Sequence, residues 1–261
     1  MKKIIWGMIV FLTAFMAGLL TTMVFAKEYE SAIQPHQPVY FLFGDNEHQT
    51  KWQISAKYNL IYPSDVGLYL AFTQNTKWII YNGRDTMYSM YQPEAIYRFE
   101  SGRNMFGDYV IPLVDYIQVS PIYHCSTGVE GDNHRSMNQY YGQIQFSKGD
   151  VYNFGVNGRI HGYYDVSSQN KDINVFKKNY EADVFFKLKS KTVKLLDKYE
   201  LHAKCSGNPF GYGYYILEGQ FTLFTAKIQP KFYVQYFKGY GETMVGYNQY
   251  DEVVRFGILL E

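Results

Sequence analysis

The chain has 261 residues, and its 25 Lys and Arg nearly balance its 24 Asp and Glu, so the formal charge is only +1. This balance gives no electrostatic basis for binding nucleic acid, and no nucleic-acid partner is expected. Aromatic residues make up 19% of the sequence, with 27 Tyr and 19 Phe. Such an aromatic load is typical of a strand-rich wall with aromatic girdles at two membrane interfaces.

The start of the chain has the pattern of an export signal. Lys2 and Lys3 precede a long apolar run, which closes on Ala26, a small residue suited to cleavage. The alternative is a membrane-anchoring helix, because the run is long enough to span a bilayer. The basic start and the small closing residue favour cleavage. We therefore predict a signal peptide over residues 1–26 and a mature domain over residues 27–261.

After this segment, alternation with a period of two recurs along the chain, and long helical periodicity is almost absent. No second apolar run reaches the length of a spanning helix, which excludes a multi-helix membrane protein. In residues 52–62, for example, Trp52 and Ile54 share one face while Gln53 and Lys57 share the other. Similar strands are expected at residues 66–74, 88–98, 113–124, 138–147, 152–160, 180–188, 193–204, 213–225, 229–238 and 252–260.

These segments predict about ten to twelve strands in one domain, with no linker or internal repeat between them. A soluble β-sandwich would also alternate. Several segments are about ten residues long, which is what a tilted strand needs to cross a bilayer, whereas sandwich strands are usually shorter. Together with the export signal and the aromatic load, this favours an all-β fold, a transmembrane antiparallel β-barrel of about twelve strands.

Two polar side chains near the end of one predicted strand point to the same side. His124 and Ser126 are two residues apart, so they share a face of a continuing strand. They are in phase with the apolar Ile122, which places them on the lipid-facing side. Gln118 and Ser120 have the same parity, however, so the phase of this strand is less clear than that of the others.

Asn138 and Gln74 also fall on the apolar face of their predicted strands. Polar groups that face hydrocarbon are costly unless they bond to one another, so such a cluster is a functional-site hypothesis. The alternative is that the strand ends lie at headgroup level, where a polar side chain is wet. That alternative explains one residue more easily than it explains a histidine, a serine, an asparagine and a glutamine together.

The side chains of this cluster suit acyl transfer. A serine hydroxyl becomes a good nucleophile when a neutral histidine takes its proton, and a third group bonded to the other imidazole nitrogen fixes the tautomer. Asn138 can accept that N–H, although it cannot compensate the charge of the imidazolium. A neutral third group is also cheaper to desolvate at a lipid interface than a carboxylate. The residues thus suggest ester cleavage in a membrane-embedded substrate.

The segments "HCSTG" (124–128) and "RSMN" (135–138) resemble the outer-membrane phospholipase A family, whose site reads His-x-Ser-Asn-Gly followed by Arg-Ser-Trp-Asn with matching spacing. The segments "FTQ" (72–74), "MYQPE" (90–94) and "GYGE" (239–242) are similar to further family pieces. The resemblance covers most of the mature chain. It implies a twelve-stranded barrel in the bacterial outer membrane that hydrolyses the acyl esters of membrane phospholipids.

Carried over position by position, the resemblance implies Ser126 as the nucleophile, His124 as the base and Asn138 as the orienting residue. It also implies that Gln74 supports the asparagine. The family is calcium-dependent and active as a homodimer, so Ca2+ is the expected cofactor, and a second copy of the chain is the expected protein partner.

The calcium ligands of the family carry over only in part. Arg84 and His134 occupy its hydroxyl-bearing positions, and Val129 stands where an arginine offers its backbone carbonyl. Asp85, Asp132 and Asn133 are nearby oxygen donors of the kind that calcium prefers. The candidate metal site comprises Arg84, Asp85, Val129, Asp132 and His134.

Two rival hypotheses follow from the same residues. The first is a passive pore, which is disfavoured because inward Gln, Lys, Asp and Arg side chains would fill the narrow lumen of about twelve strands. The second is a family member that has lost its activity with its calcium ligands. The two cysteines, Cys125 and Cys205, are chemically free to pair in an exported chain, and the sequence leaves their pairing open.

Overall fold

The structure is a computed structural model, and it describes residues 33–45, 49–60, 67–81, 84–100, 113–128, 134–149, 151–189, 198–207, 211–222 and 230–260. The predicted signal peptide lies outside the described residues. None of the helices in these segments is long and apolar enough to cross a membrane.

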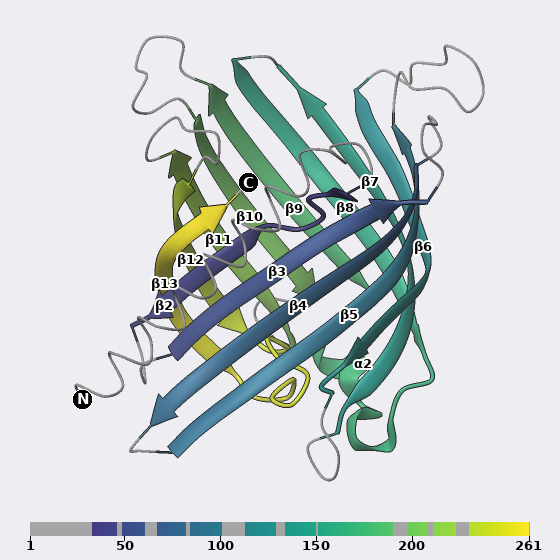
Figure 1. The fold of residues 1–261 in the computed structure, drawn as a ribbon, viewed down its shortest axis with the longest axis vertical. Coiled ribbons are helices and arrows are strands. Elements are labelled where there is room, and N and C mark those ends of the chain that lie inside the picture. The colour runs from purple at the N-terminus through teal and green to yellow at the C-terminus, as the bar shows by residue number, and fades with distance from the viewer. Residues whose placement is uncertain are drawn as a thin grey trace.

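One antiparallel sheet contains every strand of the described residues (Figure 1). Strand β3 pairs with β2 on one side and β4 on the other, which closes the strands from β2 to β13 into a twelve-stranded barrel. The prediction of an all-β barrel of about twelve strands is confirmed. The strands are β1 (Ile33–Gln34), β2 (Val39–Gly44), β3 (Gln49–Asn59), β4 (Gly67–Tyr81), β5 (Arg84–Glu100), β6 (Val114–Ser126), β7 (Ser136–Lys148), β8 (Tyr152–Tyr164), β9 (Tyr180–Lys189), β10 (Lys198–Gly207), β11 (Gly213–Thr222), β12 (Pro230–Gly239) and β13 (Asp251–Leu260).

The barrel wall is polar inside and apolar outside. On β3, Lys51 and Lys57 are buried in the interior, whereas Tyr58 on the alternate parity is 49% exposed. The same division recurs around the wall, where exposed Leu70, Val184 and many other large apolar side chains face outward. So large an apolar surface is stable where hydrocarbon covers it, as on the lipid-facing side of a membrane barrel.

Strand β2 was not among the predicted segments, because "VYFLF" has no polar alternation. Its inward residues Tyr40 and Leu42 are apolar and pack in the lumen against Tyr233 and Leu259. Both faces of this strand are therefore apolar, and the period of two disappears from the sequence.

A β-bulge in β6 explains the unclear phase of that strand. Between the cross-strand pairs Ala95–Ile122 and Tyr97–Val119, β5 advances by two residues and β6 by three. The extra residue reverses the parity, so that Ser120 is 1% exposed on the inner side and Ile122 is 56% exposed on the outer side. Residues after the bulge follow the phase of Ile122.

The segments after β8 and β12 fold at the same end of the barrel, opposite the C-terminus (Figure 1). The first contains the short helices η2 (Ser168–Asn170) and α2 (Ile173–Phe176). The second connects β12 to β13. Ile173 of the first and Met244 and Tyr247 of the second pack on the inner face of β6 and β7, against Cys125 and Met137. A small apolar core thus lies directly behind this part of the wall.

A buried cluster of charges also lies at this end, and we call Glu242, Lys51, Lys77 and Arg255 the Glu242 cluster. Glu242 accepts hydrogen bonds from Lys51 Nζ at 3.2 Å, from Lys77 Nζ at 3.0 Å and from both terminal nitrogens of Arg255. All four side chains are at most 8% exposed. Burial alone would raise the pKa of Glu242, but the three cations hold that pKa well below its ordinary value.

Candidate active site

His124 and Asn138 face each other across β6 and β7. They are direct cross-strand partners, and His124 Nδ1 lies 2.8 Å from Asn138 Oδ1. The inner positions next to them, Tyr123 and Met137, are buried in the lumen. Both members of this pair therefore project from the outer face of the wall, as the sequence predicted.

Ser126 lies two residues beyond His124 on the same outer face, at the end of β6. Its Oγ accepts a hydrogen bond of 3.1 Å from the backbone N–H of Gly128. Gly128 has φ +64°, and a Cβ at this position would lie 2.5 Å from the ring of Tyr91 on β5. Glycine is therefore required both by the left-handed backbone and by the neighbouring ring.

Asp165 contacts the amide end of Asn138, a contact that we did not predict from the sequence. Asn138 Nδ2 donates to Asp165 Oδ2 at 3.0 Å. Asp165 follows the last residue of β8, Tyr164, which is the cross-strand partner of Asn138. By alternation with the inward Tyr163, Asp165 would face the lumen. Its positive φ of 47° breaks the strand and turns the carboxylate to the outer side instead.

Gln74 lies on β4, on the outward parity of the exposed Leu70 and Phe72. Its cross-strand partner on β5 is Tyr91, and Tyr91 in turn pairs with Ser126. Two strands therefore separate Gln74 from β7, so it does not reach Asn138 within one chain. We predicted that Gln74 supports Asn138, but within one chain the side chain that contacts the Asn138 amide is that of Asp165.

Most of the candidate calcium ligands fall where the structure gives no side chain. Val129 and Asp132 lie outside the described residues, and Arg84 and Asp85 are described only as backbone at the start of β5. The carbonyl oxygen of His134 accepts a hydrogen bond of 2.9 Å from Arg135 Nη1. A guanidinium at this distance disfavours a cation at the same oxygen.

Within the segments that the structure describes, no three His, Cys, Asp or Glu side chains gather in a way that could hold a metal ion. A calcium site built from the predicted carboxylates would thus depend on Asp132 and Asp85, whose side chains are not among those described.

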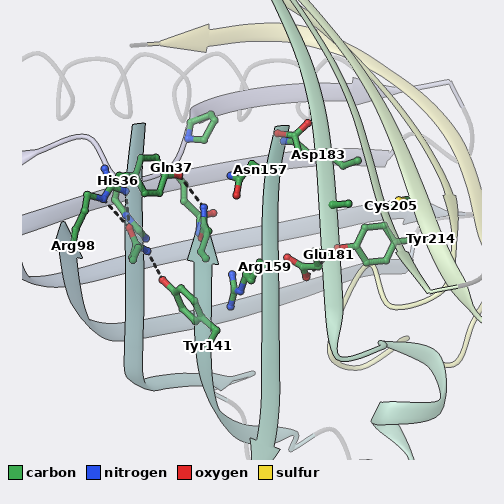
Figure 2. Close-up of a pocket in the computed structure, with 16 residues that line it drawn as sticks. His36, Gln37, Arg98, Tyr141, Asn157, Arg159, Glu181, Asp183, Cys205 and Tyr214 are labelled. Atoms are coloured by element: carbon green, nitrogen blue, oxygen red, sulfur yellow. Dashed lines mark hydrogen bonds between the residues drawn. The ribbon is translucent and has the colours of Figure 1, made fainter. Parts of the chain in front are cut away.

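A cavity of about 300 Å³ lies inside the barrel and is separate from the outward-facing residues (Figure 2). On one side of it, Arg98 donates to Gln118 Oε1 at 2.6 Å, and Gln118 donates to the hydroxyl of Tyr141 at 2.6 Å. Tyr141 donates in turn to Glu94 Oε2 at 2.7 Å. This network occupies part of the lumen with bonded polar groups, which is unfavourable for a passive pore.

The two cysteines are both free. Cys205 lines the cavity from β10, while Cys125 is buried behind the outer wall and faces Gln92 of β5. Although Cys125 lies between His124 and Ser126 in the sequence, it points to the opposite side of the wall. The thiol is therefore excluded from any chemistry on the outer face.

A closed barrel with an apolar outer wall, and with a serine, a histidine and an asparagine together on that wall, defines a class of protein: a membrane β-barrel equipped for hydrolysis at the lipid surface. The comparison with protein families agrees with this class. The model of the Phospholipase A1 family matches residues 10–260, and the chain belongs to this family. The protein is thus a phospholipase that hydrolyses carboxylic ester bonds. A search of curated proteins gave no match.

Solved structures with the same barrel include outer membrane phospholipase A from Escherichia coli, which is 20% identical, with a TM-score of 0.69 over 88% of this chain and 91% of that one. The dimer of the Salmonella typhi outer membrane phospholipase with bound calcium is 19% identical, with a TM-score of 0.69 over 88% and 93%. An active-site mutant of the Escherichia coli protein is 20% identical, with a TM-score of 0.70 over 88% and 91%. At these identities the likeness concerns the fold alone.

Proposed function

We propose that this outer-membrane phospholipase cleaves the acyl esters of membrane phospholipids with a triad of Ser126, His124 and Asn138, assisted by calcium and activated by dimerisation. The observation that carries the proposal is the 2.8 Å contact between His124 Nδ1 and Asn138 Oδ1 on the outer face, with Ser126 two residues along the same face. A hydrolytic site in this position meets its substrate within the membrane.

The asparagine oxygen is an acceptor only, so it selects the His124 tautomer that carries its proton on Nδ1. Nε2 is then free to take the proton of the Ser126 hydroxyl as that oxygen attacks the ester carbonyl. The same nitrogen returns the proton to the leaving alcohol, and a second cycle with water releases the fatty acid. Ser126 Oγ accepts from Gly128 in the resting site, so the bond to His124 would tighten when substrate binds.

The tetrahedral intermediate carries a negative oxygen that needs donors close to Ser126. The backbone N–H of Gly128 is held next to the hydroxyl by the turn, at 3.1 Å from Ser126 Oγ. We assign this N–H to the developing oxyanion, where one well-placed donor is worth about 3 to 4 kcal/mol of barrier. The ring of Tyr91 packs against Gly128 and keeps the turn in place.

Calcium, when bound, would supply a further positive charge for the ester carbonyl. We propose that the carboxylates of Asp132 and Asp85 and the carbonyl of Val129 hold it, with Asp85 contributed by the same chain or by a second copy. His134 is the weakest of the predicted donors, because its carbonyl is already bonded to Arg135. The Salmonella typhi phospholipase, which shares this barrel, is a dimer with bound calcium, and this supports both the ion and the dimer.

The first experiment measures phospholipid hydrolysis by the purified protein with calcium and with excess chelator. Ser126→Ala should fold and resist heat like the wild type yet hydrolyse no ester, and a sulfonyl-fluoride reagent should label the wild type alone. Hydrolysis retained by Ser126→Ala would exclude this residue as the nucleophile. Full activity in excess chelator would exclude calcium from the mechanism.

The second experiment tests the ligands. Asp132→Ala and Asp85→Ala should each raise the calcium concentration for half-maximal activity. The heat resistance of the barrel should be unchanged, because Asp85 is at the start of β5 and Asp132 falls between β6 and β7 in the sequence. An unchanged calcium requirement in both variants would show that other oxygens hold the ion.

A further inference from the structure

Resting on the proposed triad, we infer that Asp165 is a fourth, positioning residue of the site, which acts on His124 through Asn138. An asparagine amide has an acceptor end and a donor end of nearly the same shape, so Asn138 could offer either end to the imidazole. Only the acceptor end selects the productive tautomer of His124.

Asp165 removes this ambiguity. An ionised carboxylate accepts hydrogen bonds and donates none, so the NH2 of Asn138 must face Asp165, 3.0 Å away. The amide oxygen is then directed to His124 Nδ1 at 2.8 Å. Reversal of the amide would place its oxygen against the carboxylate and its NH2 against the N–H of the imidazole, which breaks both contacts.

The carboxylate also supplies the charge that an asparagine lacks. When His124 takes the proton of Ser126, an imidazolium forms beside a neutral amide. The negative charge of Asp165 lies one hydrogen bond farther away and stabilises that cation through Asn138. The site thus combines a neutral third member in the wall with a charge at its exposed edge, where hydrating a carboxylate is easy.

The backbone of Asp165 supports the inference independently. Its φ of 47° is in the left-handed region, which few residues other than glycine adopt. Among the described non-glycine residues, only Leu113 shares this property. Strain of this kind is characteristic of functional sites, and here it brings the carboxylate out of the lumen parity and onto the outer face beside Asn138.

The test uses the full-length protein with phospholipid substrate at saturating calcium. Asp165→Asn keeps the shape and tolerates the left-handed backbone, while Asp165→Gly removes the side chain without backbone strain. Both variants should lower kcat roughly tenfold, leave KM unchanged and slow sulfonyl-fluoride labelling of Ser126 by a similar factor. Gln169→Ala, an exposed change in the same segment, is the matched control and should behave as the wild type.

A double variant separates positioning from other roles. In the background of Asn138→Ala, Asp165→Asn should cause no further loss, because the two residues act in series. Wild-type kcat in Asp165→Asn, or an equal loss with and without Asn138, would overturn the inference. A loss that added calcium restores would also overturn it, since Asp165 would then be a metal ligand. If Ser126→Ala retained activity, the triad itself would fail, which is a different result.

Discussion

Asn138 lies between the imidazole of His124 and the carboxylate of Asp165. This position changes the effect that we expect for the substitution Asn138→Asp. In an isolated Ser-His-Asn site, Asn138→Asp would be mild, since aspartate is the usual third member. Here the new carboxylate would lie against Asp165, about 3 Å away, and two like charges at that distance do not both remain ionised. The two carboxyl groups would then either share a proton or move apart, and residue 138 would no longer be held as an acceptor against the imidazole.

We therefore predict that Asn138→Asp lowers kcat by at least about tenfold, and that Asp165→Asn in the same molecule restores most of the loss. In the double variant the carboxylate at 138 accepts from the imidazole and from the new amide. The measurement is kcat for the two single variants and the double variant. Equal activities of Asn138→Asp and the double variant would contradict the prediction.

Gly128 offers a second test at the scale of one residue. A methyl group there meets the ring of Tyr91 at 2.5 Å and must adopt φ +64°, so Gly128→Ala should displace the turn and its N–H. We expect a loss of roughly 100-fold in kcat, as for the removal of one oxyanion donor, with unchanged heat resistance. Gly142→Ala on β7 is the control, because no atom lies within 4 Å of its Cβ position. Similar kcat values for both variants would remove Gly128 from the site.

At the scale of the element, the bulge in β6 decides which side chains reach the lipid. Deletion of the exposed Pro121 would remove the extra residue and restore strict alternation, while the cross-strand pairs on both sides of the bulge stay the same. His124 and Ser126 would therefore remain outward and Cys125 inward. Pro121→Ala keeps the residue count and should keep the bulge and the activity. We predict that neither the deletion nor the substitution abolishes hydrolysis.

The readout for this prediction is thiol labelling in a Cys205→Ala background. Cys125 is 1% exposed in the wild type and should not react with an apolar maleimide. It should stay equally protected in the deletion variant. An inactive deletion variant with a reactive Cys125 would show that this part of the strand has reversed its faces, and it would contradict the prediction.

The elements also show how far the sequence leads. Eleven segments with polar and apolar alternation correspond to strands, and β3 shows why: each of its inward residues from Lys51 to Lys57 is polar and each outward one is not. Strand β2 was not predicted, because its inward residues Tyr40 and Leu42 are apolar and pack against an apolar patch in the lumen. The cross-strand neighbours His124 and Asn138 share the outer face because period-2 alternation holds on both sides of the turn between them.

Asp165 could not be predicted in the same way. It belongs to no motif, it lies 27 residues after Asn138, and alternation assigns it to the wrong face. Its contact with Asn138 depends on the register between β7 and β8 and on the left-handed backbone of Asp165 itself, and no sequence pattern predicts either feature. The sequence likewise marked Glu242 only as part of a family-like segment, and its charge partners could not be predicted because they come from β3, β4 and β13.

At the scale of the whole molecule, the Glu242 cluster joins four separate parts of the chain. Glu242→Gln would leave the buried Lys51 and Arg255 without a carboxylate, and Lys77 with Asp251 alone, which costs about 3 to 5 kcal/mol of unfolding free energy. Glu252→Gln is the matched control, because Glu252 pairs with Lys238 in an exposed position, where an ion pair contributes at most about 1 kcal/mol. The measurement is the midpoint of heat unfolding of each variant, followed by gel mobility. Equal midpoints for Glu242→Gln and Glu252→Gln would contradict the prediction.

The same carboxylate gives this contribution a pH dependence. The folded pKa of Glu242 lies below its ordinary value of 4.5, so its stabilisation is complete above that value and is lost as the pH falls below it. The wild-type midpoint should thus fall more steeply between pH 5 and about pH 3 than the midpoint of Glu242→Gln. If the unfolding midpoints of the wild type and of Glu242→Gln fell equally steeply with decreasing pH, carboxylates other than Glu242 would dominate acid unfolding.

The charges of the Glu242 cluster also affect the passage of ions through the barrel. Lys51, Lys77 and Arg255 surround one carboxylate at the end of the barrel where the loop between β12 and β13 enters the lumen. An ion crossing there would have to displace a buried, hydrogen-bonded group of net positive charge, which repels cations. We therefore expect the barrel to carry hydrolytic chemistry on its outer wall while its lumen passes few cations across the membrane.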